Sequence, residues 1–85
     1  MERRITSKKS DKDGDITHIY GNNWGPVTVQ DAVFQIEHNL YQYYVDEAGY
    51  RSDVYVEQTP WGHKFIKTYA DKTSKNNLDN LPEHR

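Results

Sequence analysis

The sequence contains no cysteine, and this absence excludes disulfide bonds, thiol nucleophiles and cysteine metal ligands. Aliphatic side chains are also scarce, since Leu, Ile, Val and Phe together supply 16 of the 85 residues. Seven Tyr and two Trp offset part of this deficit, because a buried aromatic side chain removes about 150–250 Å² from water. The composition therefore predicts one small folded domain, residues 1–85, with an aromatic-rich core.

Long hydrophobic runs are absent as well. Residues 1–5 are mostly charged and are followed by no apolar stretch, so the sequence predicts neither a secretory signal nor a membrane span. We therefore expect a cytoplasmic protein without membrane contacts. The sequence leaves open whether the chain is a monomer or a weak homodimer.

Charge is distributed unevenly along the chain, whose formal net charge is -2. Residues 1–12 carry a net charge of +3, residues 13–57 of -7 and residues 58–85 of +2. If the first and last strands are neighbours, basic side chains from both ends gather into one patch: Arg3, Arg4, Lys8, Lys64 and Lys67. The simpler interpretation is that both ends are solubilised and that lysines protect edge strands from pairing with other chains.

Turn signals predict the elements of the first third of the chain. Residues 3–9 and 15–20 form a predicted hairpin, because the Asp13-Gly14 step between them suits a tight turn. Residues 21–26 are dense in Gly and Asn and end at Pro26, which indicates a loop.

One amphipathic helix is predicted after Thr28, a capping residue followed three positions later by Asp31. Asn39 is suited to end this helix in the left-handed conformation. Apolar residues spaced three and four apart form its expected buried stripe: Val29, Ala32, Val33, Ile36 and Leu40.

Beyond residue 40 the hydrophobic period changes from helical to alternating. Three further strands are predicted at residues 41–46, 52–57 and 63–69. The expected fold class is α+β, two-layer, with one amphipathic helix packed on a mostly antiparallel sheet in the order β-β-α-β-β-β. Residues 70–85 are expected to be a docked C-terminal segment in which Leu78 and Leu81 insert at the edge of the core.

Several segments taken together resemble a known family. They are Asp-Ile-Thr-His-Ile at 15–19, the loop with Trp24, the helix at 28–37, Tyr-Tyr-Val at 43–45, Gly-His-Lys-Phe-Ile-Lys-Thr at 62–68 and Asn-Leu-Asp-Asn-Leu-Pro-Glu at 77–83. In this order, and over nearly the whole chain, they are similar to the bacterial family catalogued as domain of unknown function 3892 (DUF3892). The resemblance implies a small stand-alone domain and brings no established activity with it.

Patterns for enzymatic or metal chemistry are weak. Asp11, Asp13 and Asp15 alternate as in a calcium loop, but Gly14 stands at the fourth position where such a loop needs glycine at the sixth. The four histidines lack the spacings of zinc or di-iron sites, and neither a nucleophile elbow nor a glycine-rich phosphate loop is present. We therefore expect no enzyme, no catalytic residue, no metal and no cofactor.

Two binding hypotheses remain. In the first, exposed aromatic side chains bind an unidentified protein, so that the domain is an interaction or regulatory module. In the second, tyrosines and lysines on the open sheet face bind single-stranded nucleic acid, although the strongly acidic middle of the chain weighs against this. The candidate surface residues are Trp24, Tyr41, Tyr43, Tyr55, Trp61, Lys64 and Lys67. Protein interaction is the favoured hypothesis.

Overall fold

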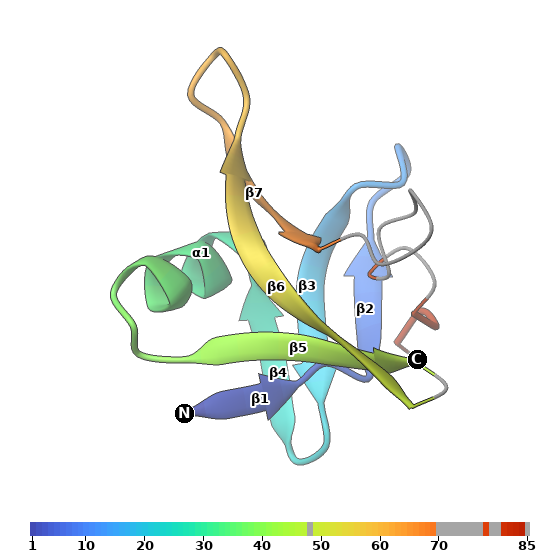
Figure 1. Cartoon of the computed structure of the whole chain (residues 1–85). Helices are drawn as coiled ribbons and strands as arrows, with labels where there is room; N and C mark the ends of the chain where they lie inside the picture. The colour runs from blue at the N-terminus through green and yellow to red at the C-terminus, as the bar shows by residue number, and fades with distance from the viewer. Residues whose placement is uncertain (48, 70–77, 79–80, 85) are drawn as a thin grey trace.

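The computed structural model describes residues 1–47, 49–69, 78 and 81–84 (Figure 1). Within these residues the chain forms seven strands and one helix. They are β1 (Glu2–Arg4), β2 (Ser7–Ser10), β3 (Ile16–Gly21), β4 (Trp24–Thr28), α1 (Val29–Glu37), β5 (Gln42–Glu47), β6 (Tyr50–Gln58) and β7 (Lys64–Thr68). The predicted α+β class, with a single helix packed on sheet, is confirmed.

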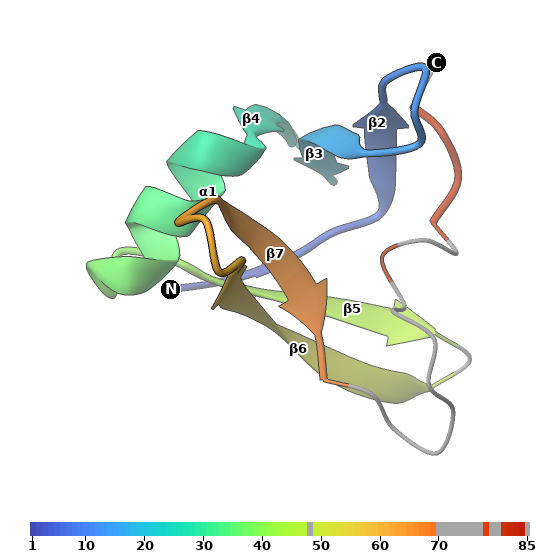
Figure 2. The same cartoon turned by 90° about the horizontal axis from the view of Figure 1, so that it is seen from above.

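The strands form two sheets, one with the order β1-β5-β6-β7 and one with the order β2-β3-β4. Among the described strands, β1 and β5 pair in parallel, and the other strand pairs are antiparallel. Figure 2 shows α1 and the three-stranded sheet on one side of the four-stranded sheet. The core lies between these two layers, and its buried residues come from both: Ile5, Ile19, Ala32, Val33, Tyr43, Val45, Val54, Ile66 and Leu78.

The predicted strand at residues 3–9 is in fact two strands that belong to different sheets. The backbone N–H of Ile5 donates to the Tyr44 carbonyl in β5 at 2.9 Å, whereas the N–H of Thr6 donates to the Tyr20 carbonyl in β3 at 2.9 Å. The chain therefore crosses from one sheet to the other between these two residues. Ile5, at the crossing point, is 1% exposed and joins the core.

The predicted loop at residues 21–26 is also wrong, because β4 begins within it at Trp24. Gly21 pairs with Trp24 across a tight turn in which Asn23 has a φ of 68°. The breaker Pro26 is tolerated here because β4 is an edge strand, where a missing N–H interrupts no further pairing. Four strands thus precede the helix, rather than the two expected.

Helix α1 begins and ends as the sequence predicts. The Thr28 side chain accepts a hydrogen bond from the backbone N–H of Asp31 at 3.1 Å, which satisfies one unpaired donor of the first turn. After the last helical residue, Asn39 adopts a φ of 57°, the left-handed conformation that ends many helices.

The predicted buried stripe of this helix is correct except at its end. Ala32 and Val33 are buried, and Val29 and Ile36 pack against the core. Leu40 is 52% exposed, because the helix stops at Glu37 and the following turn rotates this side chain off the stripe.

The basic patch considered from the sequence does not form. Strands β1 and β7 lie at opposite edges of the four-stranded sheet, so Arg3 and Arg4 are separated from Lys64 and Lys67. Lys8 lies in the other sheet and is only 8% exposed. The condition for the patch, that the first and last strands are neighbours, is therefore not met.

Near the C-terminus, Leu78 is completely buried and Leu81 packs against the core. The following residues lie along β2: the Pro82 carbonyl accepts from the N–H of Lys8 at 3.0 Å, and the N–H of His84 donates to the Lys8 carbonyl at 2.7 Å. The rest of the predicted docked segment, residues 70–77, 79–80 and 85, lies outside the described residues.

Candidate functional site

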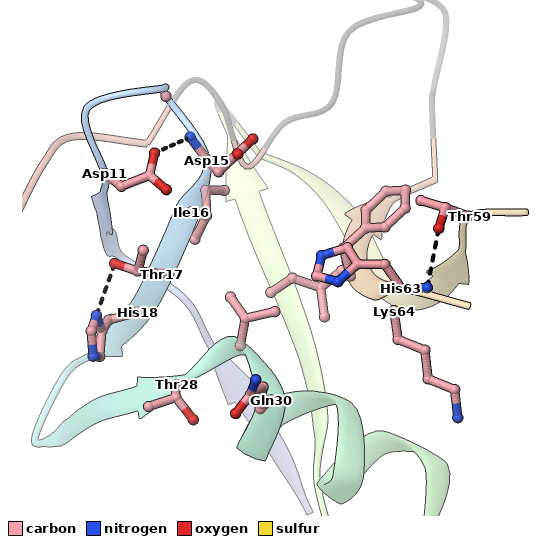
Figure 3. A pocket seen from close by; sticks show the side chains of 14 residues that line it. Asp11, Asp15, Ile16, Thr17, His18, Thr28, Gln30, Thr59, His63 and Lys64 are labelled. Atoms are coloured by element: carbon pink, nitrogen blue, oxygen red, sulfur yellow. Dashed lines mark hydrogen bonds between the residues drawn. The ribbon is translucent and has the colours of Figure 1, made fainter. Parts of the chain in front are cut away.

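A groove of about 700 Å³ opens between β3 and β7 beside the first turn of α1 (Figure 3). Three of its lining residues belong to the core or pack against it, so the bottom of the groove is apolar: Ile16, Val29 and Ile66. Its rim is polar, with Asp11, Asp15, Thr17 and His18 on the β3 side and Thr59 and His63 on the β7 side. An apolar concavity with a few polar groups is typical of ligand and partner sites.

The turn before β3 forms the first wall and is held by its own side chain. The Asp11 carboxylate accepts from the backbone N–H groups of Asp13 at 2.9 Å and Asp15 at 3.0 Å. Gly14, with a φ of 85°, provides the left-handed geometry of this turn and donates its N–H to the Asp11 carbonyl at 3.1 Å. The Asp11 carboxylate is thus committed to the turn, whereas the exposed Asp15 carboxylate lies at the rim.

The turn between β6 and β7 forms the second wall. The Thr59 hydroxyl accepts from the N–H of His63 at 3.1 Å, and the N–H of Thr59 donates to the His63 carbonyl at 2.8 Å. Gly62, with a φ of 87°, completes the turn. Trp61 lies at its tip and is 90% exposed. Tryptophan is highly buried on average in folded proteins, so this exposure is unusual.

The two lysines of the candidate surface are each paired with a carboxylate. Lys64 Nζ lies 2.8 Å from an oxygen of Glu37 at the end of α1. Lys67 Nζ lies 3.3 Å from an oxygen of Glu57 on β6. Because all four side chains are partly exposed, each pair contributes little stability, but each pair places a carboxylate beside the lysine cation.

Three of the predicted surface aromatics come together, but on the inner side of the sheet. The Arg3 guanidinium carbon lies 3.6 Å from the ring centroid of Tyr41 and 5.2 Å from that of Trp24. The rings of Trp24 and Tyr43 are 5.4 Å apart. Tyr43 is only 1% exposed, so its ring contributes to the core and not to the surface.

Polar contacts also hold the Tyr43 hydroxyl. It donates to the Gln35 side chain on α1 and accepts from Arg3 Nη1 at 3.3 Å. Burial raises the pKa of Tyr43, and the hydrogen bond from Arg3 offsets part of this effect. This tyrosine therefore links helix, sheet and N-terminal strand.

The groove and the three clustered aromatic residues lie within the part of the chain that matches a family. A family model described as a protein of unknown function (DUF3892) matches residues 4–82. The chain belongs to the DUF3892 family. No curated protein and no solved structure matches it. In the described residues of this DUF3892 chain, no helix is long and apolar enough to cross a membrane, and no group of three or more His, Asp or Glu side chains is placed to hold a metal ion.

The outer face of the four-stranded sheet in this DUF3892 chain carries residues that sequence reasoning did not select. Arg51 lies over the ring of Tyr44 at 4.2 Å and forms ion pairs with Glu2 at 2.8 Å and Asp53 at 2.9 Å. The hydrogen bond from Arg51 lowers the pKa of Glu2. The alternation of residues 41–46 correctly separates Tyr44 from Tyr43, but no local signal brings Glu2 to Arg51.

Tyr55 lies on this outer face as expected, apart from the other candidate tyrosines. The β6–β7 register places it opposite Lys67, and its ring stacks on Tyr69 with centroids 4.4 Å apart. The seven predicted surface residues are therefore divided among three places: Lys64 in the groove and Trp61 in the turn beside it, Trp24, Tyr41 and Tyr43 in the inner cluster around Arg3, and Tyr55 and Lys67 on the outer face.

The raised pKa of Tyr43 predicts a pH dependence of the stability of this DUF3892 protein. In the unfolded chain Tyr43 loses its proton near the ordinary pKa of 10.0, whereas in the folded protein its pKa is higher. The free energy of unfolding is therefore unaffected by this group below about pH 10 and falls as the pH rises above that value. Tyr43→Phe is expected to flatten this decline, while the lost hydrogen bonds cost about 1–2 kcal/mol at neutral pH. Urea midpoints measured at neutral pH and above about pH 10 test this, with the exposed Tyr50→Phe as control. Identical declines in wild type and Tyr43→Phe would contradict it.

Proposed function

We propose that this protein is a non-enzymatic interaction module that binds a segment of another protein in the groove between β3 and β7. The position of Trp61 carries the proposal. This side chain is 90% exposed at the tip of a turn whose two ends, Thr59 and His63, line the groove. Tryptophan is among the residues most enriched at the energetic centres of protein interfaces, so Trp61 is suited to close over a bound segment.

The two walls of the groove support this proposal because they are fixed before any partner arrives. Hydrogen bonds between Asp11 and Asp15 hold one turn, and those between Thr59 and His63 hold the other. Both hairpin tips project toward the same end of the molecule (Figure 1). A pre-formed site loses less conformational entropy on binding than a flexible one.

The polar groups of the groove favour binding over catalysis. At the rim, the side chains of Thr17 and His18 are in contact, with the Thr17 hydroxyl oxygen 2.9 Å from His18 Nδ1. A hydroxyl next to a histidine is the arrangement that a catalytic nucleophile would need. The Thr17 hydroxyl, however, donates to the Lys9 carbonyl at 3.1 Å, so its proton is directed to the backbone. A catalytic hydroxyl must instead donate its proton to the base, and a third group must orient that base.

The nucleic-acid hypothesis has less support than the sequence suggested. It needs tyrosines and cations on one exposed face, but Tyr43 is buried and Lys64 and Lys67 are paired with carboxylates. On the outer face, Arg51 is likewise paired with Glu2 and Asp53. Phosphate contacts are made by Lys and Arg cations, and Lys64 and Lys67 already face carboxylates, so protein interaction is the better-supported function.

Trp61→Ala is expected to weaken partner binding about 30-fold or more, which corresponds to about 2 kcal/mol for an interface anchor. The test is cross-linking capture from lysate by the full tagged chain, with each captured protein then titrated against purified variants. The matched control is Tyr50→Ala, an aromatic residue that is 69% exposed at the opposite end of β6. Both side chains are exposed, so neither variant should change the unfolding midpoint. A captured protein that binds wild type and Trp61→Ala equally, or the absence of any captured protein, would contradict the proposal.

A further inference from the structure

We infer that the bound segment is an extended strand that adds to β7 along Lys64 and Ile66, on the side away from β6, and carries a basic side chain facing Asp15. This inference rests on the proposed function and names the class of segment that the groove accepts. It follows from the hydrogen-bond pattern of β7, the position of its edge and the charge of the opposite wall.

The β6–β7 ladder shows which backbone groups of β7 point away from β6. The N–H of Tyr69 donates to the Asp53 carbonyl at 3.1 Å, and the N–H of Thr59 donates to the His63 carbonyl at 2.8 Å. Hydrogen-bonded and non-hydrogen-bonded pairs alternate in an antiparallel ladder. Lys64 and Ile66 therefore occupy non-hydrogen-bonded pairs, and their N–H and C=O groups are directed to the other edge.

That other edge borders the groove. Strand β7 is last in the order of its sheet, so no described strand pairs with it there, and both Lys64 and Ile66 line the groove. Across the groove, the β3–β4 pairing stops at His18 and Thr28, where the chain turns into α1. A single extended segment can thus lie beside β7, and exposed strand edges are known templates for such addition.

The charge of the opposite wall selects the side chain of the incoming strand. Lys64 is the only lysine or arginine among the described lining residues, and its Nζ is neutralised by Glu37 at 2.8 Å. Asp11 uses its carboxylate within its own turn, which leaves Asp15 exposed at the rim. Complementary charge gives an interface specificity and orientation, so a lysine or arginine facing Asp15 fits this wall.

The apolar bottom of the groove determines which other side chains the added strand should carry. Side chains alternate between the two faces of an added strand. One set then faces the surface formed by Ile16, Val29 and Ile66, and this set is expected to be β-branched. The predicted segment is therefore an alternating β-branched stretch with one basic residue on the side of Asp15.

The test uses the full ¹⁵N-labelled chain and two acetylated seven-residue peptides of alternating Val and Thr, with Lys or Glu at the centre. The Lys peptide is expected to slow hydrogen exchange of the Ile66 amide and to bind about fivefold more tightly than the Glu peptide at low salt, since an exposed charge pair changes affinity by about 1 kcal/mol. Asp15→Asn should bring the two affinities within about twofold. The control Asp13→Asn, in the same turn but outside the groove lining, should keep the difference.

Each other result overturns part of the account. Equal affinities of the two peptides for the wild type, with Ile66 protected, would overturn the basic side chain. No protection of Ile66 by either peptide, while capture still depends on Trp61, would overturn strand addition but not the proposed function. Loss of both the protection and the dependence on Trp61 would overturn the proposed function as well.

Discussion

Leu78→Ala is expected to lower the free energy of unfolding by about 2–5 kcal/mol, a large part of the 5–15 kcal/mol typical of a whole domain. Leu78 is 0% exposed and belongs to the core together with residues of both sheets and the helix. A cavity at this position cannot be filled by a neighbour without disturbing a core that has few aliphatic side chains. Urea denaturation followed by circular dichroism measures the loss.

Leu40→Ala is the matched control for Leu78→Ala, because it removes the same atoms from a side chain that is 52% exposed. It is expected to change the free energy of unfolding by no more than about 0.5 kcal/mol. Similar unfolding midpoints for the two variants would show that Leu78 does not hold the C-terminal part of the chain to the core.

Ile19→Ala is the second substitution expected to be severe, with a loss of about 2–5 kcal/mol. Ile19 is 0% exposed in β3, the central strand that pairs with both β2 and β4. Its loss loosens the strand that forms one wall of the groove. Ile19→Val, which removes a single methylene, is expected to cost about 0.5–1.5 kcal/mol. If thermal and urea unfolding place both variants together near the wild type, the Ile19 side chain is not part of the core.

The elements that sequence reasoning predicted correctly depend on neighbouring residues. The start of α1 follows from the short-range bond between Thr28 and Asp31, and its end from the left-handed Asn39. The buried Ala32 and Val33 follow from helical spacing alone. Such features are set by local geometry and periodicity, which a single sequence records directly.

The elements that it missed depend on contacts between distant parts of the chain. The first short strand ends at Arg4, before Ile5, and it exists because β1 pairs in parallel with β5, some forty residues away. Trp24 begins a strand because Gly21 in β3 offers it an edge. The sequence predicts Tyr43 on the surface, but its ring is 1% exposed and belongs to the core. Local turn and propensity signals do not encode these pairings.

The candidate site also combines features that depend on neighbouring residues with features that depend on distant contacts. Exposure of Trp61 in a turn was predictable from its Pro60-Trp61-Gly62 context, whereas the pairing of Lys64 with Glu37 needs the helix to end beside β7. The groove exists because residues of two hairpins, far apart in sequence, line the same concavity. No spacing in the sequence therefore identifies Asp15 and Ile66 as residues that line one groove.

The central claim is that the groove beside β7 is the binding surface of this protein. Its most direct test is amide and indole shift mapping of the ¹⁵N-labelled chain, titrated with the segment of a captured partner whose binding depends on Trp61. We expect the largest shifts at Ile16, Ile66 and the Trp61 indole, and none above background at Tyr44 and Tyr69 on the outer sheet face. Shifts concentrated at Tyr44 and Tyr69, with Ile16 and Ile66 unchanged, would contradict the account.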